Sequence, residues 1–282
     1  MDLLPGQLVT EIVARALAED LGGRGDITTG AIVPAEATGR FRLVSRQVGV
    51  LSGVEAAVET FAQCETGIEI DWREGEGDLL EPGTVIAELS GPAAAILMAE
   101  RTALNFLGRL SGVATLTRRY VDAVAETDAR IAHTRKTTPG LRALELAAVR
   151  AGGGSSHRFG LDDAILIKDN HVAIAGGVHE AIRRARLSAG HMVRIAAEID
   201  SLDQLEEALD AGAESILLDN FSHADLKQAV MRCRGQGVTL EASGSISLDT
   251  VGEIAAAGVD IISVGALTHS APNIDLGLDS VD

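Results

Sequence analysis

The sequence predicts an α/β protein in two parts, a small α+β domain followed by a parallel α/β sheet that closes toward a barrel. With 282 residues, the chain is long enough for about two domains. Short alternating segments predict strands as far as about residue 90, and continuous apolar strands alternate with helices after residue 130. A hydrophobic share of 46% and a charged share of 23% exclude a wholly disordered chain.

The first part begins with a predicted helix over residues 5–20, whose apolar side chains recur at helical spacing. This helix ends in the glycine-rich segment 21–26. Residues 41–45 and 84–89 have the pattern of strands, and Glu81-Pro82-Gly83 predicts a turn before the second of them.

A long helical stretch follows from residue 93 to about residue 125. Gly112 and the β-branched residues near it predict a division into two helices. The boundary between the two domains is expected in the same region.

The second part has predicted strands that alternate with helices and leave both faces of the sheet covered. The predicted strands are 164–168, 195–199, 215–219, 238–241 and 260–265, and the predicted helices are 201–209, 224–233 and 248–257. Several strands end in polar residues or glycine: Glu198, Asp219, Glu241 with Ser243, and Gly265. Because sites in such folds are built at the carboxyl ends of the strands, we expect the site there.

The net charge of −17 argues against a broad nucleic-acid-binding surface. Residues 101–171 nevertheless carry 11 Lys and Arg against 7 Asp and Glu, a local balance of +4 within an acidic chain. Two of the three lysines, Lys136 and Lys168, lie in this window. The pattern is consistent with a pocket for an anionic small molecule, or with a helix surface that carries scattered arginines.

The longest apolar run, residues 93–99, is too short to span a membrane, which needs about 20 residues. Residues 1–5 lack the basic stretch that opens a secretory signal, so a cytoplasmic location is expected.

Cys64 and Cys233 belong to no metal-binding motif and are interpreted as inert thiols.

Three segments could carry the chemistry of the site. In residues 133–140, Arg135 and Lys136 stand among hydroxyls before a Pro-Gly turn, which suits a loop that grips phosphate or carboxylate, although an exposed basic turn has the same pattern. The glycine-rich segment 152–158 ends in His157 and Arg158. Lys168 follows four apolar residues at a strand end.

The carboxylates at strand ends, Glu198, Asp219 and Glu241, could hold magnesium together with a ligand's phosphates, or could neutralise the nearby cations. The glycine turns at 243–245 and 264–266 follow the last two predicted strands. This is the usual position of a monophosphate site in a barrel.

In these segments the chain resembles the quinolinate phosphoribosyltransferase family. The matching stretches are Glu19 to Thr29, Glu100 to Thr115, Thr134-Arg135-Lys136-Thr137-Thr138-Pro139-Gly140, Gly152 to Arg158, Leu166 to His171, Leu217 to Asn220 and Val264 to Thr268. They occur in order along nearly the whole chain.

The resemblance implies an N-terminal α/β sandwich domain (1–110), an open α/β barrel domain (111–268) and a tail (269–282) that returns to the first domain. It also implies an enzyme of NAD biosynthesis that uses Mg²⁺ and converts quinolinate and phosphoribosyl pyrophosphate to nicotinate mononucleotide, pyrophosphate and carbon dioxide. The family works as a homodimer with shared active sites or as a larger assembly of dimers, such as a hexamer.

The resemblance also implies residue roles. The quinolinate carboxylates would meet Arg135, His157, Arg158 and Lys168, and Arg101 would reach the site of the neighbouring subunit. Lys136, Glu198 and Asp219 would lie at the end of the site that binds pyrophosphate, ribose and magnesium. The resemblance also implies a catalytic role for Lys168 and a binding role for Thr134. Ser243, Gly244 and Gly265 would hold the 5-phosphate.

One position departs from the family. Ala196 stands where the family strand usually has an acidic residue, which leaves Glu198 alone. A related molybdenum-associated branch shares much of the pattern, but the Thr-Arg-Lys and His-Arg pairs favour the enzyme of NAD synthesis.

Two other classes of function remain open from the residues themselves. A barrel aldolase would use Lys168 as a Schiff-base nucleophile. An acidic binding protein would use the cationic window to grip a dicarboxylate without catalysis.

Overall fold

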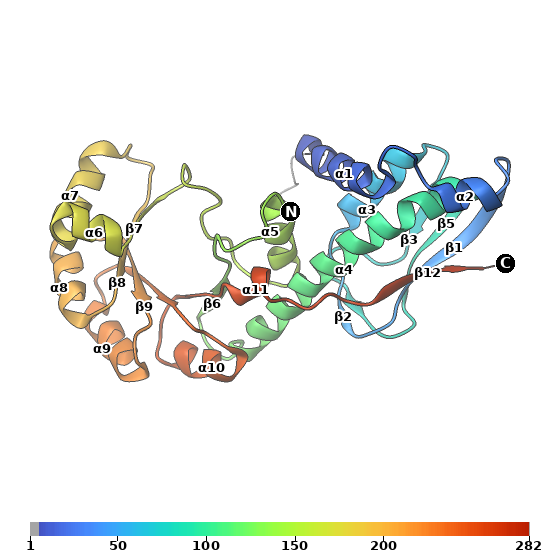
Figure 1. Cartoon of the computed structure of the whole chain (residues 1–282). Helices are drawn as coiled ribbons and strands as arrows, with labels where there is room; N and C mark the ends of the chain where they lie inside the picture. Colours follow the sequence, from blue (N-terminus) through green and yellow to red (C-terminus); the bar gives the residue numbers. More distant parts are fainter. Residues whose placement is uncertain (1–5, 282) are drawn as a thin grey trace. The chain divides into compact units, whose positions relative to one another are not determined.

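A computed structural model describes residues 6–281 (Figure 1). Residues 1–5, which carry the argument about a secretory signal and the first residue of the predicted N-terminal helix, lie outside the described residues. The chain forms two compact units, which are described separately. Within the described residues, the first unit comprises 6–118, 137–153 and 266–281, and the second comprises 119–136 and 154–265.

The first unit combines helices with a small antiparallel sheet. Its helices are α1 (Gly6–Leu21), α2 (Ile27–Ile32), α3 (Val54–Cys64), α4 (Ala93–Ala123, the last residues of which belong to the second unit), α5 (Arg142–Ala151) and α11 (Ala266–His269). Its strands are β1 (Thr38–Ser45), β2 (Gly49–Val50), β3 (Glu69–Trp72), β4 (Leu79–Leu80), β5 (Val85–Pro92) and β12 (Leu276–Ser280).

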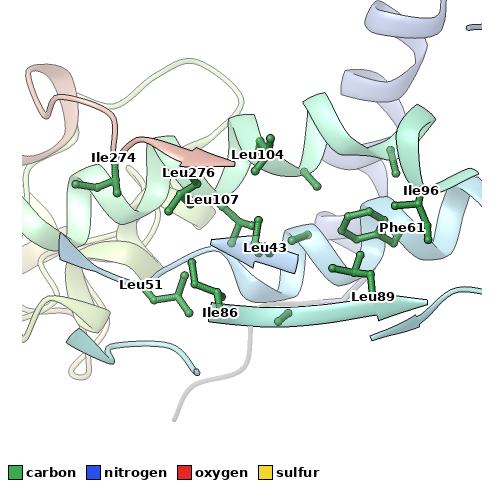
Figure 2. Packing of buried hydrophobic residues seen from close by; sticks show 14 of the residues in the cluster. Leu43, Leu51, Phe61, Ile86, Leu89, Ile96, Leu104, Leu107, Ile274 and Leu276 are labelled. Atoms are coloured by element: carbon green, nitrogen blue, oxygen red, sulfur yellow. The ribbon is translucent and has the colours of Figure 1, made fainter. Parts of the chain in front are cut away.

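The core of the first unit lies between the four-stranded sheet, ordered β12-β1-β5-β3, and helices α3 and α4. Figure 2 shows Leu43 and Leu89 from the sheet packed with Phe61 from α3 and Leu107 from α4. Alternation along β1 puts Leu43 on the buried side while Arg42 stays exposed, as expected for a strand with one solvated face.

Helix α4 is continuous, so the predicted division at Gly112 is wrong. A Cβ at position 112 would collide with the carbonyl oxygen of Pro272. The glycine therefore serves a close approach of the tail to the helix rather than a break. Because neighbouring residues keep helical hydrogen bonds, one glycine costs a helix only about 1 kcal/mol.

Strand β12, near the end of the chain, pairs antiparallel with β1 at the register Phe41↔Ser280. Ile274 and Leu276 of the same segment join the core of the first unit (Figure 2). The sequence shows no pattern from which this pairing could be predicted.

The second unit is a parallel sheet with crossover helices. Its strands are β6 (Arg130–Ala132), β7 (Ile165–Ile167), β8 (Ile195–Ile199), β9 (Ser215–Asp219), β10 (Thr239–Ser243) and β11 (Ile261–Ser263). Its helices are α6 (Asp169–Ala175), α7 (Val178–Ser188), α8 (Leu202–Asp210), α9 (His223–Cys233) and α10 (Leu248–Ala256).

The six strands lie in the order β6-β11-β10-β9-β8-β7, and every pair is parallel. Helices α6 to α9 follow one another along the outer side of β7, β8 and β9 (Figure 1). The two end strands, β6 and β7, form no ladder with each other, and an isolated bridge between Ala132 and Ser155 stands beside β6 instead. The result is an open barrel-like sheet with all carboxyl strand ends at one edge.

The predicted fold class, an α/β sandwich domain plus an open barrel-like α/β domain, is confirmed. Strands β8 and β9 begin and end at the predicted residues. The predicted division at residues 110 and 268 stays a prediction, and the compact units themselves are not continuous in sequence. Among residues 6–281, no helix is both long and apolar enough to cross a membrane.

Candidate active site

Most candidate residues of the second unit stand at the carboxyl ends of its parallel strands, and His157 and Arg158 join them because Ser155 bridges to Ala132 at the end of β6. Thr134, Arg135 and Lys136 follow β6, His157 and Arg158 precede β7, and Lys168 follows β7; Glu198, Asp219 and Ser243 lie in β8, β9 and β10, Gly244 follows β10 and Gly265 follows β11. Parallel pairing brings these ends to the same edge of the sheet. Segments more than a hundred residues apart in sequence thus contribute to one region.

Two half-buried arginines at this edge have a buried Nε atom without a partner among the described residues. The Nε atoms of Arg135 and Arg158 are buried and have no hydrogen-bond partner within the described part of the chain. Burial, together with the nearby charge of Arg135, lowers the pKa of the Arg158 guanidinium. Two neighbouring cations that repel each other are stabilised by an anion placed between them.

Two hydrogen bonds hold Arg158 in position, one from its side chain and one from its backbone N–H. Its Nη1 donates to the carbonyl oxygen of Ala164 at 3.0 Å, and its backbone N–H donates to Nδ1 of His157 at 2.8 Å. These bonds leave the guanidinium only partly satisfied, which makes it a ready donor for a planar anion.

Lys168 forms an ion pair with Glu198, through Nζ and Oε2. Glu198 is mostly buried, with 15% of its side chain exposed, whereas Lys168 is 45% exposed. Because Glu198 also acts on Arg158 through its charge, the carboxylate lies among the cations rather than apart from them. Ala196 lies two residues earlier, on the same face of β8 as Glu198, and brings no second acid.

The loop after β6 is shaped by Thr134, whose Oγ1 accepts a hydrogen bond from the backbone N–H of Lys136 at 3.1 Å. This turn places Arg135 and Lys136 side by side in a compact loop. His133, which begins the loop, is 1% exposed.

A second group of strand ends surrounds a cavity of about 300 Å³, whose lining includes Asn220, Ser243 and Gly244. Asn220 has a left-handed backbone, with φ of 54°, and its N–H donates to the carbonyl oxygen of Ser243 at 2.9 Å. Gly244 has φ of 102°, and a Cβ there would collide with the Asn220 side chain. Only glycine allows this turn to approach so closely.

Two further predicted residues are placed by their elements alone. Gly265 follows β11 at the same sheet edge. Arg101 lies in α4 of the first unit and is exposed.

Within residues 6–281, no three His, Cys, Asp or Glu side chains gather into a group that could hold a metal ion. Glu198 is engaged by Lys168, and Oδ2 of Asp219 accepts from Nδ2 of Asn220 at 2.9 Å. Mg²⁺ commonly binds through one or two carboxylates together with substrate phosphates. The two carboxylates fit that mode of binding and do not fit an all-protein cage.

Sequence reasoning gave no site role to His133 and Asn220, and named Glu241 only as a strand-end carboxylate for magnesium or for a cation. His133 and Glu241 contact His157, and Asn220 supports the turn at Ser243 and Gly244. The period of two along β10 places Glu241 on the same face as Ser243, but it does not predict the contact with His157. Nothing in the sequence pattern reveals the contact of His133.

An open parallel α/β barrel with underpartnered cations at its strand ends defines an enzyme class that binds small, multiply charged anions. The N-terminal domain of quinolinate phosphoribosyl transferase matches residues 26–111, and the C-terminal domain of the same family matches residues 113–279. The chain belongs to the quinolinate phosphoribosyl transferase family, as the sequence motifs predict.

Relatives support this assignment over almost the full length. The chain is 45% identical to the nicotinate-nucleotide pyrophosphorylase (carboxylating) of Mycobacterium leprae, over 95% of this chain and 96% of the relative. It is 44% identical to the probable nicotinate-nucleotide pyrophosphorylase (carboxylating) of Bacillus subtilis, over 93% of this chain and 89% of the relative. The solved nicotinate-nucleotide pyrophosphorylase of Francisella tularensis has a TM-score of 0.94 at 38% identity, covering 99% of this chain and 98% of that one. Membership makes this chain a phosphoribosyltransferase, and the predicted enzyme class is confirmed.

Proposed function

We propose that this chain joins quinolinate to the phosphoribosyl group of phosphoribosyl pyrophosphate, as a step of NAD biosynthesis. The pyridine nitrogen forms a bond to C1 of the ribose while the bond from C1 to pyrophosphate breaks. The 2-carboxylate then leaves as carbon dioxide, the electron pair stays on ring carbon 2, and that carbon takes a proton from water. The products are nicotinate mononucleotide, pyrophosphate and carbon dioxide.

The observation that carries this proposal is a pair of half-buried arginines whose buried Nε atoms have no hydrogen-bond partner within residues 6–281. Arg135 and Arg158 repel each other in the free protein, and a dicarboxylate relieves that repulsion. Lys168, His157 and Thr134 complete the end of the site assigned to quinolinate. Once the ring nitrogen is ribosylated and positive, it draws electrons from the departing carboxylate, so decarboxylation needs little help from an acid or base.

The phosphoribosyl pyrophosphate end is assigned to Lys136, Glu198 and Asp219. Positive charge builds on the ribose as the bond to pyrophosphate breaks, and negative charge builds on the leaving group. Lys136 stabilises the leaving group, while the carboxylates face the ribose. The close turn of Ser243 and Gly244, with Gly265, accommodates the 5-phosphate through backbone N–H groups.

Mg²⁺ would be held by Glu198 and Asp219, directly or through water, together with the phosphates of the substrate. When bound, it neutralises charge that develops on the pyrophosphate. We include it in the proposal because these two carboxylates suit a form of coordination that is shared with substrate phosphates.

The active unit is proposed to be a homodimer with shared sites, alone or within a hexamer, located in the cytoplasm. Arg101 is exposed on α4, and it is assigned to the site of the neighbouring subunit. A mixture of Arg101→Ala and Lys168→Ala chains, each inactive, should recover activity after subunit exchange, because one site in the mixed dimer is intact. Absence of recovery in dimers shown to exchange would remove the shared-site assignment.

The ion pair between Lys168 and Glu198 disfavours the aldolase alternative, since a lysine bound to a carboxylate is a poor amine nucleophile. Release of pyrophosphate from quinolinate and phosphoribosyl pyrophosphate tests the proposal directly. Equal amounts of pyrophosphate, carbon dioxide and nicotinate mononucleotide are expected, with magnesium required. No quinolinate-dependent release, or a borohydride-trapped adduct at Lys168, would overturn it.

A further inference from the structure

Glu241 is a buried carboxylate to which the proposed reaction gives no role. It lies in β10 between β9 and β11, with 7% of its side chain exposed. Its Oε1 has no hydrogen-bond partner within residues 6–281. A buried carboxylate without full compensation destabilises a fold, and an apolar residue of similar size would cost less.

The nearest donor to this oxygen is the imidazole of His157. The distance from Nε2 of His157 to Oε1 of Glu241 is 3.4 Å. Nδ1 of His157 accepts the backbone N–H of Arg158 at 2.8 Å, and a ring nitrogen that accepts carries no proton, so the N–H of the ring is on Nε2. The ring therefore directs its N–H toward the carboxylate. Such bonds are often long in the free enzyme and shorten when the substrate is bound.

His157 is also tied to the loop after β6. Its backbone N–H donates to Nε2 of His133 at 3.0 Å, and the two rings meet edge to face with centroids 6.3 Å apart. His133 directs Nδ1 toward the carbonyl oxygen of Thr134, 3.3 Å away. Glu241, His157 and His133 thus connect β10 with the two segments that carry Arg158 and Arg135.

We propose that Glu241 is a positioning residue for quinolinate binding, acting through His157. The carboxylate orients the imidazole, the imidazole holds the backbone N–H of Arg158, and the turn before β7 presents the Arg158 guanidinium to the substrate carboxylates. Glu241 itself touches no reacting atom. This inference rests on the proposed function, since it concerns the quinolinate end of that site.

The proposed role of Glu241 and a purely structural role predict different effects on the binding of the two substrates. Ser243 ends the strand that carries Glu241, Gly244 follows it, and both are assigned to the phosphate end of the site. A general distortion of β10 would therefore weaken the binding of both substrates. Loss of the contact with His157 would weaken the binding of quinolinate alone.

The test is steady-state kinetics of Glu241→Ala and Glu241→Gln with each substrate varied. For Glu241→Ala, we expect the KM for quinolinate to rise about tenfold, the size of one lost hydrogen bond of about 1.4 kcal/mol, with kcat and the other KM nearly unchanged. Glu241→Gln retains an oxygen that accepts from Nε2–H, so it should restore the quinolinate KM to within about threefold of the original. An unchanged KM for quinolinate, or an equal rise in both KM values, would overturn the proposal.

A double-mutant cycle with His157→Ala tests whether Glu241 acts through the imidazole. In the His157→Ala background, Glu241→Ala should add less than about a twofold change in the quinolinate KM. Effects that multiply would contradict the proposal. If Glu241→Ala does not fold, Glu241→Gln and Glu241→Asp serve in the same cycle, because Asp withdraws the carboxylate from His157 and should raise the quinolinate KM.

The matched control is Asp260→Asn, which alters a carboxylate at the other end of β10. Asp260 precedes β11, and its Oδ2 accepts the backbone N–H of Leu240 at 2.7 Å, toward the amino end of β10. This variant should change stability and leave the ratio of the two KM values unchanged. Failure of the proposed function would appear differently, as the absence of quinolinate-dependent pyrophosphate release from the unmodified protein.

Discussion

The two units differ in how completely their buried charged groups are hydrogen-bonded. In the first unit, Glu145 is fully buried and its oxygens accept from Arg109 at 2.8 Å, from the Thr138 hydroxyl at 2.8 Å and from the Thr138 backbone N–H at 2.9 Å. In the second unit, Arg135, Arg158 and Glu241 each have a buried polar atom with no hydrogen-bond partner among residues 6–281.

The difference separates structural charge from functional charge. A carboxylate with three donors stabilises the local arrangement, and its removal leaves an uncompensated cation. An incompletely partnered arginine destabilises the free protein and is stabilised when an anion arrives. The following predictions test whether a charged residue mainly stabilises the fold or mainly binds a ligand, as its contacts indicate.

The largest effect is expected at Glu145. Glu145→Ala leaves Arg109 without its carboxylate partner and should lower the free energy of unfolding by about 3 kcal/mol. Denaturant titration measures this change. The double variant Arg109→Leu with Glu145→Leu should recover much of the loss, because no unpaired charge remains. Full stability of the single variant would show that the network contributes little.

Lys136→Ala should lower kcat by about a hundredfold, or about 2.7 kcal/mol, because the cation assigned to the leaving pyrophosphate is lost. Turnover with both substrates saturating gives the value. Lys227→Ala, which changes an exposed lysine of α9, is the control and should have normal kinetics. Near-normal turnover of Lys136→Ala would refute its assignment.

Arg158→Met should stabilise the fold and weaken the binding of quinolinate. Removing one of two repelling buried cations should raise the free energy of unfolding by about 1 kcal/mol, while the KM for quinolinate rises at least about tenfold. Calorimetry and kinetics on the same sample test both parts. Arg232→Met, at an exposed ion pair with Glu206, should leave both nearly unchanged. A destabilised Arg158→Met variant would contradict the view that Arg158 is kept for binding.

The smallest effect is expected at Glu180 on the surface of α7. Hydrogen bonds from Arg183 and Arg184 lower the pKa of this carboxyl from 4.5 to about 2. A depressed pKa stabilises the fold above pH 4.5 and loses that contribution as the pH falls toward 2. Glu180→Gln should slightly flatten the acid branch of a stability profile in that window. Glu126→Gln, at another exposed glutamate, should leave the branch as it is; a Glu180→Gln profile identical to wild type would show that the pair is fully screened.

Sequence predicted the second unit better than the first. Strands β8 and β9 are short, mostly apolar segments that end near a carboxylate, and β9 is buried on both faces over residues 215–218, so their pattern is readable from local sequence. Gly112 was misinterpreted because the reason for the glycine is the carbonyl of Pro272, which is 160 residues later in the chain. Strand β12 was missed for a similar reason, since its pairing with β1 is entirely long-range.

The sequence motifs identified the candidate site residues. The positions of these residues at predicted strand ends indicated that they lie at one edge of the parallel sheet. The motifs could not state which cations have partners. Lys168 meets Glu198, whereas the Nε atoms of Arg135 and Arg158 do not meet any acceptor among the described residues, and residue types alone do not distinguish these cases.

By itself, the sequence determined the fold class, the family and the strand ends at which the charged residues lie, because apolar periodicity and short motifs are local properties of the chain. Tertiary structure decided which buried charges are satisfied and which remain open to a ligand. Electrostatic energy at these residues depends on distances of a few ångströms between segments far apart in sequence, and only the folded chain sets those distances.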